Sequence, residues 1–119
     1  MAAVSSGTAR IDWEIAQGAT ASLNLTWTVG GTPVDLTGYT ARCTVKDTYG
    51  GTAWLTLTSA GGAIVLGGAA GTIVVTATAT QTAALAAPAN GVFDVELVSG
   101  ATVRRLVAGS VTVTPEVTT

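Results

Sequence analysis

Apolar and polar side chains alternate along most of the chain, which is the pattern of β-strands with one buried face. The clearest alternation runs from Ala21 to Val29, where large apolar residues from Leu23 onward occupy every second position and Ser, Asn or Thr lies between them. The same alternation predicts further strands over residues 11–15, 39–46, 53–58, 63–66, 72–78, 92–98, 101–108 and 110–114. Glycine-rich or polar stretches separate these segments and predict turns.

One segment departs from this alternation and favours a helix. Residues from Thr80 to Ala87 are compatible with helical structure, Thr80 is a candidate N-cap, and Pro88 ends the segment. A helix of this length is not stable alone, so we expect a single turn that crosses between strands.

Many short strands at a spacing of roughly ten residues predict an all-β fold, a two-layer antiparallel β-sandwich of immunoglobulin-like type. We expect the one short helix to lie before the penultimate strands. A closed barrel is the alternative, because periodicity alone does not separate the two. The expected organisation is a flexible N-terminal arm over residues 1–10, the sandwich over 11–114, and a C-terminal tail over 115–119.

Charge is scarce in this chain. Only 10% of the 119 residues are charged, the net charge is −2, and the mean hydropathy is +0.53. A free soluble protein normally carries more surface charge, so we expect a partner to cover part of this surface. Five basic residues, of which only Arg104 and Arg105 are adjacent, argue against nucleic acid as that partner. No apolar run reaches the ~18 residues of a membrane span, and Met1–Arg10 lacks the pattern of a secretion signal.

The longest uncharged stretch lies between Asp47 and Asp94. It is either a solvated, threonine-coated surface or a subunit interface, since the centres of interfaces are poor in charge. Trp54 favours the interface, because the alternation places it on the face opposite Leu55 and Leu57, where its indole would be exposed. The candidate interface residues are Trp54, Thr56, Thr58 and Tyr49.

Candidate chemistry is sparse. There is no histidine, which removes the usual general base and metal ligand, and no phosphate-binding loop is present. Asp94 and Glu96 share one strand face, as a carboxylate pair for hydrolysis or a calcium site would; a solvated outer face is the simpler interpretation. Cys43 is the single cysteine and is expected to be a small buried residue. We therefore expect no catalytic activity, no metal and no cofactor.

A cross-strand ion pair is also expected. If Ser99 and Gly100 form a two-residue turn, Asp94 lies opposite Arg105. The same register puts Arg104 on the apolar face, so we expect a bulge or a longer turn nearby.

Several segments together resemble a known family. They are Gln17–Thr20 before a Leu-Asn-Leu-Thr-Trp strand, Pro33–Ala41 (PVDLTGYTA), Leu55–Thr58, Gly68–Ile73, Gln81–Leu85 and Val92–Leu97. In this order they resemble small immunoglobulin-like virion proteins of tailed phages, a family similar to the N-terminal domain of phage upper-baseplate proteins. The resemblance spans about residues 11–114 and carries no catalytic residues.

This resemblance implies a non-enzymatic structural protein of the virion, in a tail, baseplate, fibre-attachment or neck position. The expected partners are other virion proteins and further copies of the same chain, as a homo-oligomer in the particle. Two alternatives stay open. One is a capsid decoration protein; the other is a host-adhesive carbohydrate-binding sandwich with Tyr49 and Trp54 as the sugar platform.

Overall fold

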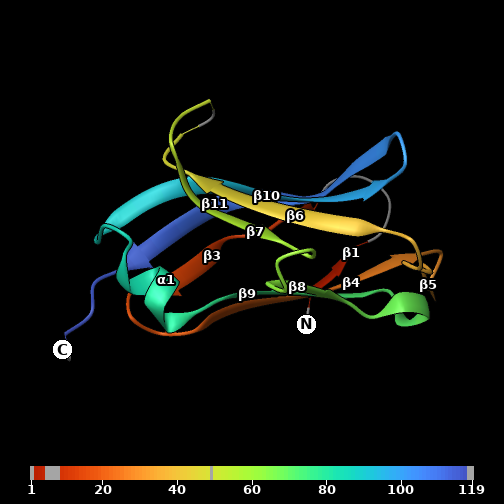
Figure 1. Ribbon diagram of the computed structural model, residues 1–119, viewed down its shortest axis with the longest axis horizontal. Helices are drawn as coiled ribbons and strands as arrows, with labels where there is room; N and C mark the ends of the chain where they lie inside the picture. The colour runs from red at the N-terminus through yellow and green to blue at the C-terminus, as the bar shows by residue number, and fades with distance from the viewer. Residues whose placement is uncertain (1, 5–8, 49, 118–119) are drawn as a thin grey trace.

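The structure is a computed structural model that describes residues 2–4, 9–48 and 50–117, with the backbone alone for residues 2–4. Two sheets pack face to face (Figure 1). The first, here the β4 sheet, has the order β1–β4–β9–β8, and β5 pairs with β4. Its strands are Ala2–Val4 (β1), Ala21–Val29 (β4), Thr32–Pro33 (β5), Ile64–Leu66 (β8) and Thr72–Ala77 (β9).

The second sheet, here the β10 sheet, has the order β2–β11–β10–β6–β7, and β3 also pairs with β11. Its strands are Ala9–Arg10 (β2), Trp13–Ala16 (β3), Thr40–Lys46 (β6), Ala53–Thr58 (β7), Ala89–Ser99 (β10) and Thr102–Thr114 (β11). A short 3-10 helix, Gly68–Ala70, and one α-helix complete the described elements. The prediction of an all-β sandwich with one short helix is confirmed.

The strand order is that of an immunoglobulin-like sandwich. Read in chain order, one sheet has the A–B–E–D sequence of neighbours and the other has C′–C–F–G. Most strand pairs are antiparallel, as predicted, and the parallel pairs lie at the sheet edges: β1 runs parallel to β4, and β2 and β3 run parallel to β11. The start of the chain therefore contributes to both sheets in turn (Figure 1).

The N-terminal segment was expected as an arm outside the sandwich. In the structure, Ala2–Val4 and Ala9–Arg10 form paired strands at the sheet edges. Residues 5–8 lie outside the described residues, and the flexibility of the arm stays a prediction. At the other end, the backbone N–H of Glu116 donates to Oε1 of Gln17 at 3.1 Å, and residues 118–119 are outside the described range.

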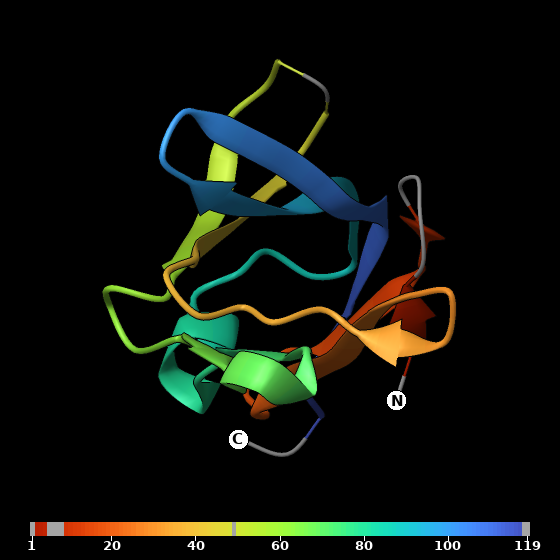
Figure 2. The same ribbon diagram turned by 90° about the vertical axis from the view of Figure 1, so that its right-hand side faces the viewer.

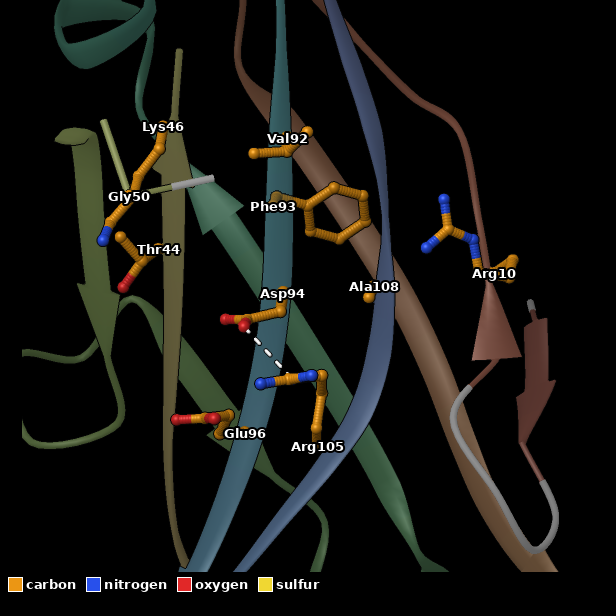
Figure 3. Close-up of a pocket in the computed structure, with 10 residues that line it drawn as sticks. All are labelled: Arg10, Thr44, Lys46, Gly50, Val92, Phe93, Asp94, Glu96, Arg105 and Ala108. Carbon is orange, nitrogen blue, oxygen red and sulfur yellow. Dashed lines mark ion pairs between the residues drawn. The ribbon is translucent and has the colours of Figure 1, made fainter. Parts of the chain in front are cut away.

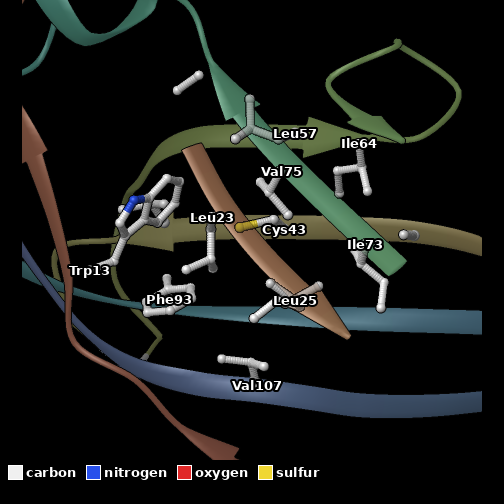
Figure 4. Packing of buried hydrophobic residues seen from close by; sticks show 14 of the residues in the cluster. Trp13, Leu23, Leu25, Cys43, Leu57, Ile64, Ile73, Val75, Phe93 and Val107 are labelled. Carbon is white, nitrogen blue, oxygen red and sulfur yellow. The ribbon is translucent and has the colours of Figure 1, made fainter. Parts of the chain in front are cut away.

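The core follows the alternation read from the sequence. Along β4 the buried positions are Ala21, Leu23, Leu25 and Trp27, and Trp13 and Ile15 of β3 are buried likewise. Figure 4 shows Leu23 and Leu25 of β4 beside Cys43, Phe93 and Val107 of the opposite sheet. At one end, the rings of Trp13 and Phe93 pack edge to face with centroids 5.5 Å apart.

The helix is shorter than expected and starts earlier. It spans Ala79–Ala83, and its N-cap is Thr78, not Thr80. Thr78 accepts from the N–H of Gln81 at 3.1 Å, and Gln81 Oε1 accepts from the N–H of Thr78 at 2.9 Å. This reciprocal pair is a capping box, which satisfies two backbone donors at the helix start and so fixes where the helix begins.

The last hairpin differs from the expected one in its turn. Ser99 pairs with Thr102, so the two loop residues are Gly100 and Ala101, and Gly100 has a positive φ of 58°. The two strands expected over 101–114 are one strand, β11, with a register shift opposite Val95 and Glu96. This irregularity confirms the expected bulge.

Arg104, which the expected register places on the apolar face, lies near this bulge. Its guanidinium stacks over the ring of Trp27, 5.3 Å from the centroid, at the end of the apolar interior. The ring of Tyr39 packs edge to face on the same tryptophan at 6.1 Å. A cation over an indole is favourable, so the arginine is accommodated on the apolar side of its strand.

The Pro33–Ala41 segment contains the end of β5, the loop that joins the two sheets, and the start of β6. Oδ1 of Asp35 accepts from the backbone N–H of Thr37 at 3.0 Å and from its hydroxyl at 2.6 Å. Leu36 between them is buried, and its N–H donates to the carbonyl of Gly68 at 3.0 Å. The motif therefore places a buried leucine by closing a tight turn around it.

Candidate interaction surfaces

The uncharged stretch forms one side of the sandwich. Its first two strands, β7 and β8, are the last strands of their sheets on that side; β7 pairs with β6, and β8 pairs with β9. We call β7, β8 and the loop of residues 59–63 between them the neutral edge. Figure 2 shows the molecule end on, with this loop connecting the two layers.

The neutral edge lacks the usual protection of a sheet edge. Edge strands normally carry charges, especially lysine, or proline, which prevent pairing with another chain. Neither β7 nor β8 contains such a residue. Val65 in the middle of β8 is 60% exposed, the largest exposure of a big apolar side chain within the described strands. The edge is therefore suited to contact with another polypeptide.

The four candidate interface residues have different outcomes. Thr56 is exposed on β7, as expected. Thr58 is half-buried, and its side-chain oxygen accepts from the N–H of Gly61 at 3.0 Å, within the neutral edge. Tyr49 lies outside the described residues. Whether these threonines contact a partner stays a prediction.

Trp54 is not an exposed indole, so the expectation for its side chain is wrong. It is partly buried and packs against the hydrophobic core. A Cβ added to the buried Gly91 of β10 would come within 3.0 Å of the ring atoms of Trp54, so the indole lies over that glycine. The cause is a register shift between Val45 and Lys46, where Ala53 pairs with Lys46 and Trp54 is the additional residue. The same shift leaves Ala53, which was expected inside, exposed.

A second surface carries half of the charged residues of the chain. On the outer face of β6, β10, β11 and β2, polar residues lie side by side in rows set by the strand register. One row joins Thr44, Asp94, Ala108 and Arg10; the next joins Arg42, Glu96 and Arg105; a third joins Lys46, Val92 and Ser110. We call this the charged face.

Two ion pairs cross the charged face. Nε of Arg42 lies 2.8 Å from Oε1 of Glu96, and Nε of Arg105 lies 3.4 Å from Oδ2 of Asp94. The expected pairing of Asp94 with Arg105 is therefore present, but diagonally, because the bulge places Arg105 opposite Glu96. Partial burial and the nearby Glu96 raise the pKa of Asp94, and the basic neighbours partly offset this.

This arrangement bears on the carboxylate pair seen in the sequence. Each carboxylate of Asp94 and Glu96 is bound to an arginine. No group of three or more potential metal ligands occurs among the residues that the structure describes. The pair thus has the geometry of a salt-bridged outer face.

A hollow of about 340 Å³ opens on the charged face (Figure 3). Its floor includes Asp94 and the short side chain of Ala108, and its rim carries Lys46 on one side and Arg10 on the other. Sequence reasoning missed this site. The charged positions on the predicted strands 39–46 and 92–98 are visible in the sequence. Nothing in the sequence shows that these two strands are neighbours.

Cys43 lies in the core, fully buried on β6. Burial, with a smaller effect of Asp94, raises the pKa of its thiol to about 12. A thiol with such a pKa is not a nucleophile at neutral pH, so the expected structural role is consistent with its position. Within the described part of the chain, no helix has the length and apolar character needed to cross a bilayer.

Fold and surfaces together define an immunoglobulin-like β-sandwich with one neutral edge and one charged face. The sequence matches no known protein family and no curated protein. Among solved structures, the fold is similar to one described as the N-terminal domain of phage TP901-1 ORF48. The TM-score is 0.58, the identity is 9%, and the match covers 94% of each chain. At this identity the similarity establishes a shared fold, and that fold occurs in a phage protein.

Proposed function

We propose that this chain is a non-enzymatic structural protein of a tailed-phage virion that acts by packing against neighbouring subunits. The observation that carries the proposal is the neutral edge: two adjoining edge strands, one from each sheet, without a charged residue. The shared fold with a phage protein domain supports the phage setting.

In this proposal the neutral edge is covered in the particle. Removing an uncharged strand edge from water costs less than removing a charged one, since an unpaired buried charge is expensive. The open backbone groups of β7 can pair with an extended segment of the neighbour. Several copies in a symmetric tail, baseplate, fibre-attachment or neck position would use the same edge repeatedly, as would a capsid decoration protein.

The test places a charge on the neutral edge. Thr56→Glu is expected to leave the fold intact, because Thr56 is exposed, and to reduce incorporation into particles at least tenfold. Thr102→Glu is the matched control: it makes the same change at an exposed strand position away from this edge. Copies per particle are measured by quantitative mass spectrometry, and folding by thermal melting.

Normal incorporation of Thr56→Glu, with the fold unchanged, would show that the neutral edge is not the contact surface. Loss of both variants alike would point to a general effect of added acid. The carbohydrate-binding alternative loses one of its two platform residues, because Trp54 packs against the core. We therefore do not propose it.

A further inference from the structure

The hollow of the charged face has two basic residues that its own acidic groups do not pair with. Asp94 is held by Arg105 and Glu96 by Arg42. Arg10 and Lys46, on opposite sides of the hollow, form no ion pair with any described residue. Figure 3 shows their side chains flanking the floor.

Charge is distributed unevenly between this face and the rest of the chain. Four of the five basic residues are here, against the two carboxylates of the ion pairs, while the chain as a whole is acidic, with a net charge of −2. Asp12 lies beside this face, where its Oδ1 accepts from the hydroxyl of Ser110 at 2.6 Å, and with its charge included the basic side chains still outnumber the acidic ones by one. The face therefore attracts an anionic partner.

The two carboxylates inside the hollow decide what kind of anion fits. A continuous polyphosphate crossing from Lys46 to Arg10 would pass over Asp94 and be repelled there. A small-molecule pocket is commonly lined mainly by apolar and aromatic groups, whereas five of the ten residues that line this one are charged. A polypeptide with separated carboxylates avoids the repulsion by Asp94, because a neutral residue of the polypeptide can lie over Asp94 and Ala108.

The strand spacing sets the separation of those carboxylates. Lys46 and Arg10 are three strand steps apart, or about 14 Å, and are offset by two residues along the strands. In an extended segment, side chains four residues apart lie on the same side and about 13 Å from each other. Flexible lysine and arginine side chains cover the remaining difference.

We infer that the hollow binds an extended acidic segment of a partner protein, with carboxylates four residues apart on Lys46 and Arg10 and a small residue between them over Ala108. The partner lies across the strands of the β10 sheet. This contact is separate from the neutral edge and does not depend on it.

The test uses the purified full chain and short peptides capped at both ends. The probe is Glu-Thr-Ser-Thr-Glu; the controls are Lys-Thr-Ser-Thr-Lys and Glu-Ser-Glu-Thr-Thr, which has the same charge at the wrong spacing. Amide chemical shifts are followed by NMR during titration. Saturable shifts on β6, β10, β11 and β2 are expected, at least threefold weaker for the wrong spacing and absent for the basic peptide.

Substitutions locate the contact. Lys46→Gln and Arg10→Gln are each expected to weaken binding at least threefold, and the double variant at least tenfold. Thr102→Glu is the matched control, because it lowers the net charge by the same amount at an exposed position outside the hollow; it is expected to change binding less than twofold.

Three results of the peptide titration would overturn the inference. They are no saturable shift with the acidic probe, equal binding of both acidic peptides, and binding that persists in the double variant. Concentration-dependent shifts of the same amides without peptide would also overturn it, since the occupant would then be a second copy of this chain. None of these outcomes affects the test of Thr56, which measures incorporation into particles.

Discussion

Replacing Trp54 with alanine separates the role that the sequence predicts, an exposed interface anchor, from the role that the structure indicates, packing against the core. If the indole were an exposed anchor, the variant would assemble poorly and melt normally. The structure places the ring over Gly91 and against the core. We therefore expect Trp54→Ala to destabilise the domain itself.

The size of the effect follows from burial. A tryptophan buries about 150–250 Å² when fully enclosed, and removal of a fully buried one costs about 3–5 kcal/mol. Trp54 is only partly buried; removing about 100 Å² of apolar contact at about 25 cal/mol/Å² gives about 2.5 kcal/mol. For a domain of this size, that is a fall in Tm of about 10 °C.

The assay is thermal and urea unfolding followed by circular dichroism. Thr56→Ala is the control on the same strand, and because Thr56 is exposed, its Tm is expected to stay within about 2 °C. Trp54→Phe, which keeps a smaller ring, is expected to fall between the two. A Trp54→Ala protein that melts like the parent and fails only in assembly would refute the assignment of this ring to the core.

Two further substitutions and one thiol-labelling experiment test other parts of the structure. Gly109→Ala should cost about 2–3 kcal/mol and speed hydrogen exchange at Ile11, because a Cβ there overlaps the backbone of Ile11 beside β11; unchanged exchange would contradict this pairing. Cys43 should react with a thiol reagent only on unfolding. Its raised pKa means that stability falls above pH ~9, where only the unfolded thiol ionises; stoichiometric labelling of the native protein would disprove the burial. Asp94→Asn should be at least as stable as the parent at pH 7. The raised pKa means that the stability linked to Asp94 is lost as pH rises through its folded value, and a large loss in urea midpoint would contradict it.

The amino-acid sequence determined which side of most strands is buried. In a strand the side chains alternate strictly, so the apolar positions of β3, β4 and β10 identify the inner face without knowledge of the neighbours. The strand content and the single short helix followed from the same local pattern. Thr78 and Gln81 also have the spacing of a capping box in the sequence, but Thr80 is a competing N-cap candidate, and only the structure decides between them.

Local patterns fail where a partner strand changes the register. Trp54 follows the alternation of β7 in sequence, yet the additional residue opposite Lys46 turns it toward the core. A bulge is a property of two strands together, so the sequence of one strand does not reveal it. The bulge near Arg104 was foreseen only because a charged residue on an apolar face indicated a conflict.

The charged face depended on tertiary structure entirely. The sequence showed that Arg42 and Lys46 share one strand face and that Asp94 and Glu96 share another. It did not show that these strands pair, because the whole uncharged segment lies between them in the chain. The alternation of side chains is local, because backbone geometry sets it. Which strands become neighbours depends instead on how the two sheets bury their apolar faces together. That pairing of strands forms both the neutral edge and the hollow.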